Sequence, residues 1–161
     1  MPEPEPEPTP SAIERTVHLD ATPDDAWQLL TDPTELAGWL VEPVDLALMP
    51  GRGGRLVVDG DERRVVVDTV DEARLLRFTW WSDADPAAAS TVTFTLDADE
   101  DGSRLTVVEA PVPPVSAAGP VCHVLDATAA AGGPDDPWTR ALLALEVRSF
   151  LAVRRFAAVT A

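Results

Sequence analysis

Apolar and polar residues alternate along the chain in a series of short segments, a pattern typical of strands that bury one face. In the first segment, 13–19, Ile13, Val17 and Leu19 fall on one side and His18 falls on the other. The same alternation predicts strands at 41–49, 55–59, 63–70, 74–82, 91–96 and 104–109, with turns at 50–54, 60–61 and 99–102. Short turns join antiparallel neighbours, so the pattern predicts one meander of six or seven strands.

Capping signals predict a pair of short helices between the first two strands. Thr22 stands before Pro23 and Asp32 stands before Pro33, with an acidic residue in the turn that follows each proline. Pro137 begins a third helix, which we expect to extend to about 158.

The long helix has two faces of different character. At about 100° per residue, one face mixes large and small residues: Trp138, Ala141, Leu142, Leu145, Ser149, Ala152 and Phe156. Small side chains opposite a concave sheet leave space, so we expect a cavity there, with close helix–sheet packing as the alternative. A second stripe, formed by Leu143, Val147 and Phe150, covers the loop at 111–136 or serves a protein partner.

These elements together predict an α+β fold in which a curved antiparallel sheet wraps around the C-terminal helix. The 161 residues suit one domain, which we place at 11–161. Residues 1–10 alternate Pro and Glu and predict a disordered, extended tail.

The charge composition excludes several classes of binding partner. The basic residues number 12, all of them Arg, against 28 acidic residues, which gives a net charge of −16. An acidic surface repels phosphate groups, so we expect no nucleic-acid partner and no anionic membrane partner. No apolar run in the sequence is long enough for a bilayer span, and Cys122 has no second cysteine to pair with. We therefore expect a cytoplasmic protein.

Nucleophiles and metal ligands are sparse. His18 lies in the outward phase of its strand, and His123 is adjacent in sequence to Cys122, without metal-ligand spacing. We therefore expect no catalytic residues, no metal and no cofactor. Arg15 and Glu109 share the phase of inward apolar neighbours, which predicts either a polar anchor for a ligand's carbonyl, hydroxyl or carboxylate, or a structural ion pair.

A set of separated motifs carries a resemblance to a known family. The motifs are Ala21, Ala26-Trp27, Thr31-Asp32-Pro33, Leu36, Trp39, Gly53-Gly54, Arg74-Leu75, Thr79-Trp80, Val92-Thr93-Phe94, Gly102, Leu105 and Pro137-Trp138. In this order they resemble the SRPBCC superfamily, also called START-like or helix-grip proteins, over residues 11–157. Within it the chain is most similar to the group named after the activator of the heat-shock-protein-90 ATPase. The resemblance implies the helix-grip fold, in which the first and last strands lie side by side.

Together, the residue pattern and the resemblance predict a binding protein for a small hydrophobic or aromatic molecule, which is held between the sheet and the C-terminal helix. The expected ligand-binding residues are Arg15, Trp27, Trp39, Leu76, Phe78, Trp80, Val92, Phe94, Leu105, Val107, Glu109, Trp138, Leu142, Leu145 and Ser149. Two alternatives stay open. One is a cyclase-like or aromatase-like enzyme that uses Arg15 and Glu109. The other is a protein-interaction module, either a stress-related co-chaperone or the partner of a regulator, which binds through the C-terminal helix.

Overall fold

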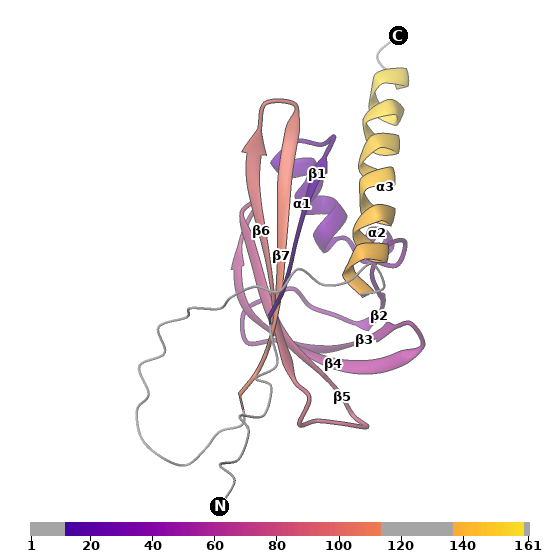
Figure 1. Ribbon diagram of the computed structural model, residues 1–161. Coiled ribbons are helices and arrows are strands. Elements are labelled where there is room, and N and C mark those ends of the chain that lie inside the picture. Colours follow the sequence, from indigo (N-terminus) through magenta and orange to yellow (C-terminus); the bar gives the residue numbers. More distant parts are fainter. Residues whose placement is uncertain (1–11, 114–136, 160–161) are drawn as a thin grey trace, which may run out of the picture.

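The computed structural model describes residues 12–113 and 137–159, in which a single curved sheet packs against a long helix (Figure 1). The seven strands are β1 (Ile13–Leu19), β2 (Glu42–Asp45), β3 (Gly53–Val58), β4 (Asp61–Asp71), β5 (Leu75–Ser82), β6 (Ser90–Asp99) and β7 (Gly102–Pro111). Their order across the sheet is β1-β7-β6-β5-β4-β3-β2, and every pair is antiparallel. The chain therefore forms the predicted meander, with its first and last strands adjacent.

Three helices lie on one side of the sheet: α1 (Pro23–Thr31), α2 (Pro33–Leu36) and α3 (Pro137–Val159). The caps are the predicted ones. The Thr22 hydroxyl accepts a hydrogen bond from the Asp25 N–H, and the Asp32 carboxylate accepts from the N–H groups of Thr34 and Glu35. These bonds satisfy N–H groups that a helix N-terminus leaves open, so the capping signals determine where each short helix begins.

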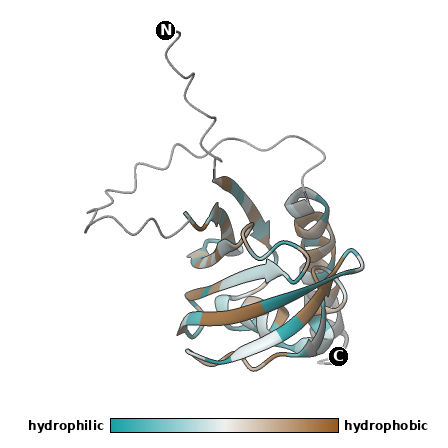
Figure 2. Ribbon diagram, turned by 90° about the horizontal axis from the view of Figure 1, so that it is seen from below, coloured by the Kyte–Doolittle hydropathy of each residue, from teal (hydrophilic) through white to brown (hydrophobic). Residues whose placement is uncertain are grey.

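The core lies between the concave face of the sheet and the helices. Alternate residues of β4 to β7 point into it, and hydropathy colouring shows apolar bands along the strands (Figure 2). The most deeply buried large side chains include Phe94, Leu105, Trp138 and Leu145, each at most 1% exposed. The strand periodicity therefore identified the buried face correctly.

Several predicted boundaries were wrong. The turn expected at 50–54 ends earlier, because Gly53 and Gly54 already pair with β4. The strand expected at 41–49 is only Glu42–Asp45, because its register with β3 shifts after Pro43 and the pairing ends at Asp45. The hairpin turn is at Asp59-Gly60 instead of 60–61, because Val58 pairs with Asp61 and both turn residues have positive φ, 50° and 84°. Such a two-residue loop with two positive φ angles follows the twist of the flanking strands.

Helix α2 and the residues that follow it contact α3. Arg148 Nη1 donates to Glu35 Oε2 at 2.8 Å, and the guanidinium lies directly against the backbone of Gly38, where any Cβ would collide with it. The next residue, Trp39, donates from Nε1 to the carbonyl of Leu29 in α1 at 2.9 Å. This segment therefore has fixed positions relative to both α1 and α3.

Predictions for the Pro/Glu tail at 1–10, for the 111–136 loop beyond residue 113, and for Cys122 and His123 lie outside the described residues. No helix within 12–113 or 137–159 combines the length and the apolar character required to cross a membrane. The division into a tail and one domain stays a prediction.

Two adjacent glycines in β3 give a test of this packing. A Cβ on Gly54 would collide with the Asp45 carbonyl of β2, whereas a Cβ on Gly53 would meet only an ordinary contact, 3.4 Å from the Val65 carbonyl. We expect Gly54→Ala to lower the free energy of unfolding by about 1–3 kcal/mol, and Gly53→Ala to leave it unchanged or raise it slightly. Urea denaturation measures both variants. Equal stabilities would contradict the close approach of β2 to β3.

Candidate functional site

A cavity of about 450 Å³ lies between the first turns of α3 and the β3–β4 hairpin. Three tryptophans form its aromatic wall: Trp39 from the segment after α2, Trp80 from β5 and Trp138 from α3. Its other lining residues are Leu40, Val58, Asp59, Asp61, Arg63, Glu109, Arg140, Ala141 and Ala144. Of the small helix residues that were expected to leave room, Ala141 lines this space and Ser149 does not, while Ala144, which the prediction did not include, lines it as well.

Glu109 is the central polar group of the cavity. Its Oε1 accepts a hydrogen bond from Trp80 Nε1 at 3.0 Å, and its Oε2 accepts one from Trp138 Nε1 at 2.6 Å. The two indoles stack with their centroids 5.8 Å apart and their planes at 24°. One carboxylate therefore satisfies the N–H groups of two indoles that are at most 4% exposed and links β5, β7 and α3.

Two phenylalanine rings pack against the tryptophans of this wall. Phe94 packs edge-on against Trp138 at 5.8 Å and against Phe78 at 5.6 Å, and Phe78 contacts Trp80 at 5.6 Å. Trp39 meets Phe94 at 6.2 Å. Ring pairs at these separations favour tilted and edge-to-face arrangements, so the five rings hold one another in fixed orientations.

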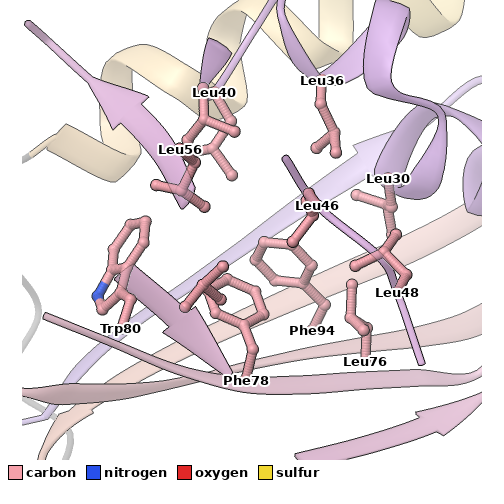
Figure 3. Close-up of a pocket in the computed structure, with 12 residues that line it drawn as sticks. Leu30, Leu36, Leu40, Leu46, Leu48, Leu56, Leu76, Phe78, Trp80 and Phe94 are labelled. Carbon is pink, nitrogen blue, oxygen red and sulfur yellow. The ribbon is translucent and has the colours of Figure 1, made fainter. Parts of the chain in front are cut away.

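A second, apolar pocket lies deeper among these rings and the leucines of the α2 region (Figure 3). Leu36, Leu40 and Leu56 point into it from one side and Phe78 and Phe94 from the other. Its volume is about 20 Å³, which is room for about one water molecule. This part of the interior is packed core, and the 450 Å³ cavity is the larger of the two spaces.

The structure separates the predicted ligand-binding residues into three groups. Trp39, Trp80, Glu109 and Trp138 line the large cavity, and Leu76, Phe78 and Phe94 line the small pocket, as Trp80 also does. The remaining predicted residues line neither space: Arg15, Trp27, Val92, Leu105, Val107, Leu142, Leu145 and Ser149. Ser149 has a structural contact, because its hydroxyl accepts from the Asp20 N–H at 3.3 Å and donates to the Glu146 carbonyl at 2.8 Å.

Arg15 and Glu109 lie on the same face of adjacent strands, with Arg15 opposite Val107 and Glu109 opposite Ile13. Arg15 Nε donates to the Thr139 hydroxyl at 3.4 Å, while Glu109 bonds the two tryptophans. Arg15 thus contacts the start of α3, and direct pairing with Glu109 stays a prediction.

Sequence reasoning missed Arg63, although the signal was present. Arg63 has the same phase in β4 as the buried Val65 and Val67, the same criterion that identified Arg15 and Glu109. Its guanidinium carbon lies 4.7 Å from the ring centroid of Trp80. The cavity therefore has an inward cation as well as an inward carboxylate.

Other chemistry is not assembled in the described part of the chain. No group of three or more His, Cys, Asp or Glu side chains within 12–113 and 137–159 is arranged to hold a metal ion. His18 is on the outer face of the sheet, 44% exposed and 3.9 Å from Asp20. The arrangement around Glu109 suits non-covalent recognition of a guest that is mostly aromatic.

The fold and this cavity define a helix-grip protein with a partly aromatic chamber. The family model of "Activator of Hsp90 ATPase homolog 1-like protein" matches residues 20–124, and the chain belongs to that family. The comparison with curated proteins gives no match.

Solved structures share the architecture. A protein from Mesorhizobium loti is 25% identical with a TM-score of 0.65, covering 84% of this chain and 94% of its own. DynU16, a protein of the dynemicin biosynthetic locus, is 21% identical with a TM-score of 0.66 and covers 86% of this chain, which spans 46% of DynU16. A Chromobacterium violaceum protein is 17% identical with a TM-score of 0.65, over 88% of this chain and 98% of its own. These likenesses support the fold.

Removing the carboxylate tests its linking role. In Glu109→Leu both buried indole N–H groups lose their acceptor, so we expect the free energy of unfolding to fall by about 2–4 kcal/mol. Glu109→Gln keeps one carbonyl oxygen, and we expect about half that loss. Glu62→Gln, at an exposed pair with Arg55, is the control and should change stability by less than about 0.5 kcal/mol. Urea denaturation that gives wild-type stability for Glu109→Leu would contradict the linkage.

Proposed function

We propose that this chain is a cytoplasmic binding protein that holds a small aromatic or hydrophobic molecule in the 450 Å³ cavity beside α3. The observation that carries the proposal is the aromatic chamber itself. Its volume falls in the range of small-molecule sites, about 300–1,000 Å³, and its wall combines three tryptophans with five charged side chains. The ligand's ring would lie along Trp39, Trp80 and Trp138.

Glu109 is the proposed polar anchor in this site. Each of its oxygens already accepts one indole N–H, and each carboxylate oxygen has a second lone pair. The carboxylate is therefore held in one orientation before any ligand arrives. A ligand hydroxyl directed at it would meet a fixed acceptor without a cost for ordering the side chain.

Filling the cavity tests the proposal. Ala144 lines the cavity, whereas its neighbour Leu143 is 58% exposed on the outer face of the same helix. We expect 2-ethylnaphthalene to bind the wild-type chain and to change its tryptophan emission. Ala144→Trp should weaken this binding by about tenfold or more because the new indole occupies the ligand's space, and the control Leu143→Trp should leave it unchanged.

Equilibrium dialysis measures the affinities, and thermal unfolding establishes that both variants are folded. If a wider set of naphthalenes, sterols and fatty acids also fails to bind the wild-type chain, the ligand-binding proposal is wrong. Equal loss in the Leu143→Trp control would show that the loss does not come from filling the cavity, and unchanged binding in Ala144→Trp would place the ligand elsewhere.

A protein-interaction role is the second candidate, favoured by the outer face of α3. Leu143, Val147, Phe150 and Leu151 are 58%, 59%, 46% and 50% exposed, and exposed apolar patches of this kind mark interaction sites. We expect Val147→Glu to change the free energy of unfolding by less than about 0.5 kcal/mol because the position is exposed. Sedimentation equilibrium should show any self-association of the wild type lost in this variant. A strong loss of stability in Val147→Glu would mean that this face is structural instead.

A further inference from the structure

Arg63 places a cation on the cavity wall next to the anchor. It lies in β4 opposite Leu56 and lines the cavity, with a side chain that is 31% exposed. The guanidinium stacks over Trp80, the same indole whose N–H donates to Glu109. One aromatic side chain thus positions a donor group on its face and an acceptor group at its edge.

The donors of Arg63 are not used. Its Nε is buried and has no hydrogen-bond partner; the carboxylate Oδ2 of Asp61 is 3.4 Å from Nε, within range of charge pairing but without hydrogen-bond geometry. Within the described residues no hydrogen bond of the Arg63 guanidinium is present. By contrast, Arg64 Nε donates to Asp83 at 2.6 Å, and Arg104 Nη2 donates to Asp99 at 2.9 Å.

Unused guanidinium donors in a cavity wall favour a guest that accepts hydrogen bonds. The buried Nε is closed to a guest as well as to water, so the donors open to a ligand are the Nη groups of this partly exposed side chain. A ligand oxygen that replaces water at these groups makes a hydrogen bond to a charged donor. The cation–π contact with Trp80 holds the guanidinium plane in place, and an Arg donor fork that is already ordered loses little further entropy on bonding.

Charge in the cavity distinguishes a neutral oxygen from an anionic one. Three carboxylates line the space, those of Asp59, Asp61 and Glu109, against the two guanidiniums of Arg63 and Arg140. The whole chain has a net charge of −16. The carboxylate of Asp61 already neutralises part of the positive charge of Arg63. An anionic ligand would therefore meet repulsion that a neutral carbonyl does not.

We propose that Arg63 is the specificity-determining residue of this cavity and donates to a neutral carbonyl oxygen of an aromatic ligand whose ring lies along the tryptophans. This inference rests on the proposed ligand-binding function and adds the chemical class of the ligand, an aryl ketone or a similar neutral aryl carbonyl compound.

Three probes of similar shape test the inference at pH 7 with the full chain. They are 2-acetylnaphthalene with a neutral carbonyl, 2-ethylnaphthalene without the oxygen, and the anion 2-naphthoate. Equilibrium dialysis gives each Kd. We expect the acetyl probe to bind the wild type about tenfold more tightly than the ethyl probe, the effect of one hydrogen bond to a charged donor, and more tightly than the naphthoate.

Two variants assign that preference to a residue. Arg63→Met keeps an unbranched side chain of similar shape but removes the hydrogen-bond donors. The ratio of the Kd values of the ethyl and acetyl probes should therefore fall to about one. Arg64→Met is the matched control, because Arg64 is an exposed neighbour bonded to Asp83 outside the cavity, and it should keep the full preference. A preference that persists in Arg63→Met overturns the role of Arg63.

The outcomes separate this inference from the function on which it rests. Equal binding of the acetyl and ethyl probes to the wild type overturns the carbonyl assignment and leaves the aromatic cavity in place. Tighter binding of the naphthoate overturns the neutral class in favour of an anion. No binding of any of the three probes overturns the carbonyl assignment, and failure of the wider set of naphthalenes, sterols and fatty acids as well overturns the ligand-binding function itself. These comparisons use the unaltered chain and hold even if Arg63→Met does not fold.

Discussion

The carboxylate of Glu109 is the contact on which the cavity depends. A buried indole needs an acceptor for its N–H group, and here a single side chain from the penultimate element serves one tryptophan from the sheet and another from the C-terminal helix. Without it, the stacked pair of Trp80 and Trp138 would leave two polar groups unsatisfied at the junction of β5, β7 and α3. The start of α3 is thereby fixed at a distance from the β3–β4 hairpin, and the space between them stays open.

That arrangement divides the interior into a packed part and an open part. The rings of Phe78 and Phe94 fill the sheet's concave face so well that the pocket among them has a volume of about 20 Å³. Toward the hairpin, Ala141 and Ala144 present methyl groups where larger residues would close the gap. The interior is thus packed where apolar residues dominate and open where charged residues line it. Any ligand in the open part would contact these charged groups.

Strand phase and capping chemistry predicted most of the fold from the sequence. Alternation identified the buried face, and the Thr22 and Asp32 caps identified both short helices, because these signals depend on neighbouring residues alone. The cavity was harder to place. The prediction assigned inward residues of the whole sheet to the ligand site, but phase distinguishes inward from outward and gives no depth along the strand, so Val92 and Leu105 were included although they are packed core.

The polar residues of the site show the same limit. Glu109 was identified by phase, and its two indole partners could not be, since they come from elements that are distant in sequence. Arg63 obeys the same phase rule, but it is the third residue of β4 and lies among charged residues next to the hairpin turn. Position along a strand relative to its turn therefore has to be combined with phase before an inward charge can be recognised.

The contacts of Arg148 with Glu35 and with the backbone of Gly38 affect how the cavity is bounded. They connect the segment that carries Trp39 directly to α3, and both contribute residues to the cavity wall. The opposite side of the cavity is the β3–β4 hairpin, which turns at Asp59-Gly60. The cavity is therefore bounded by cross-linked helices on one side and by a hairpin of the sheet on the other.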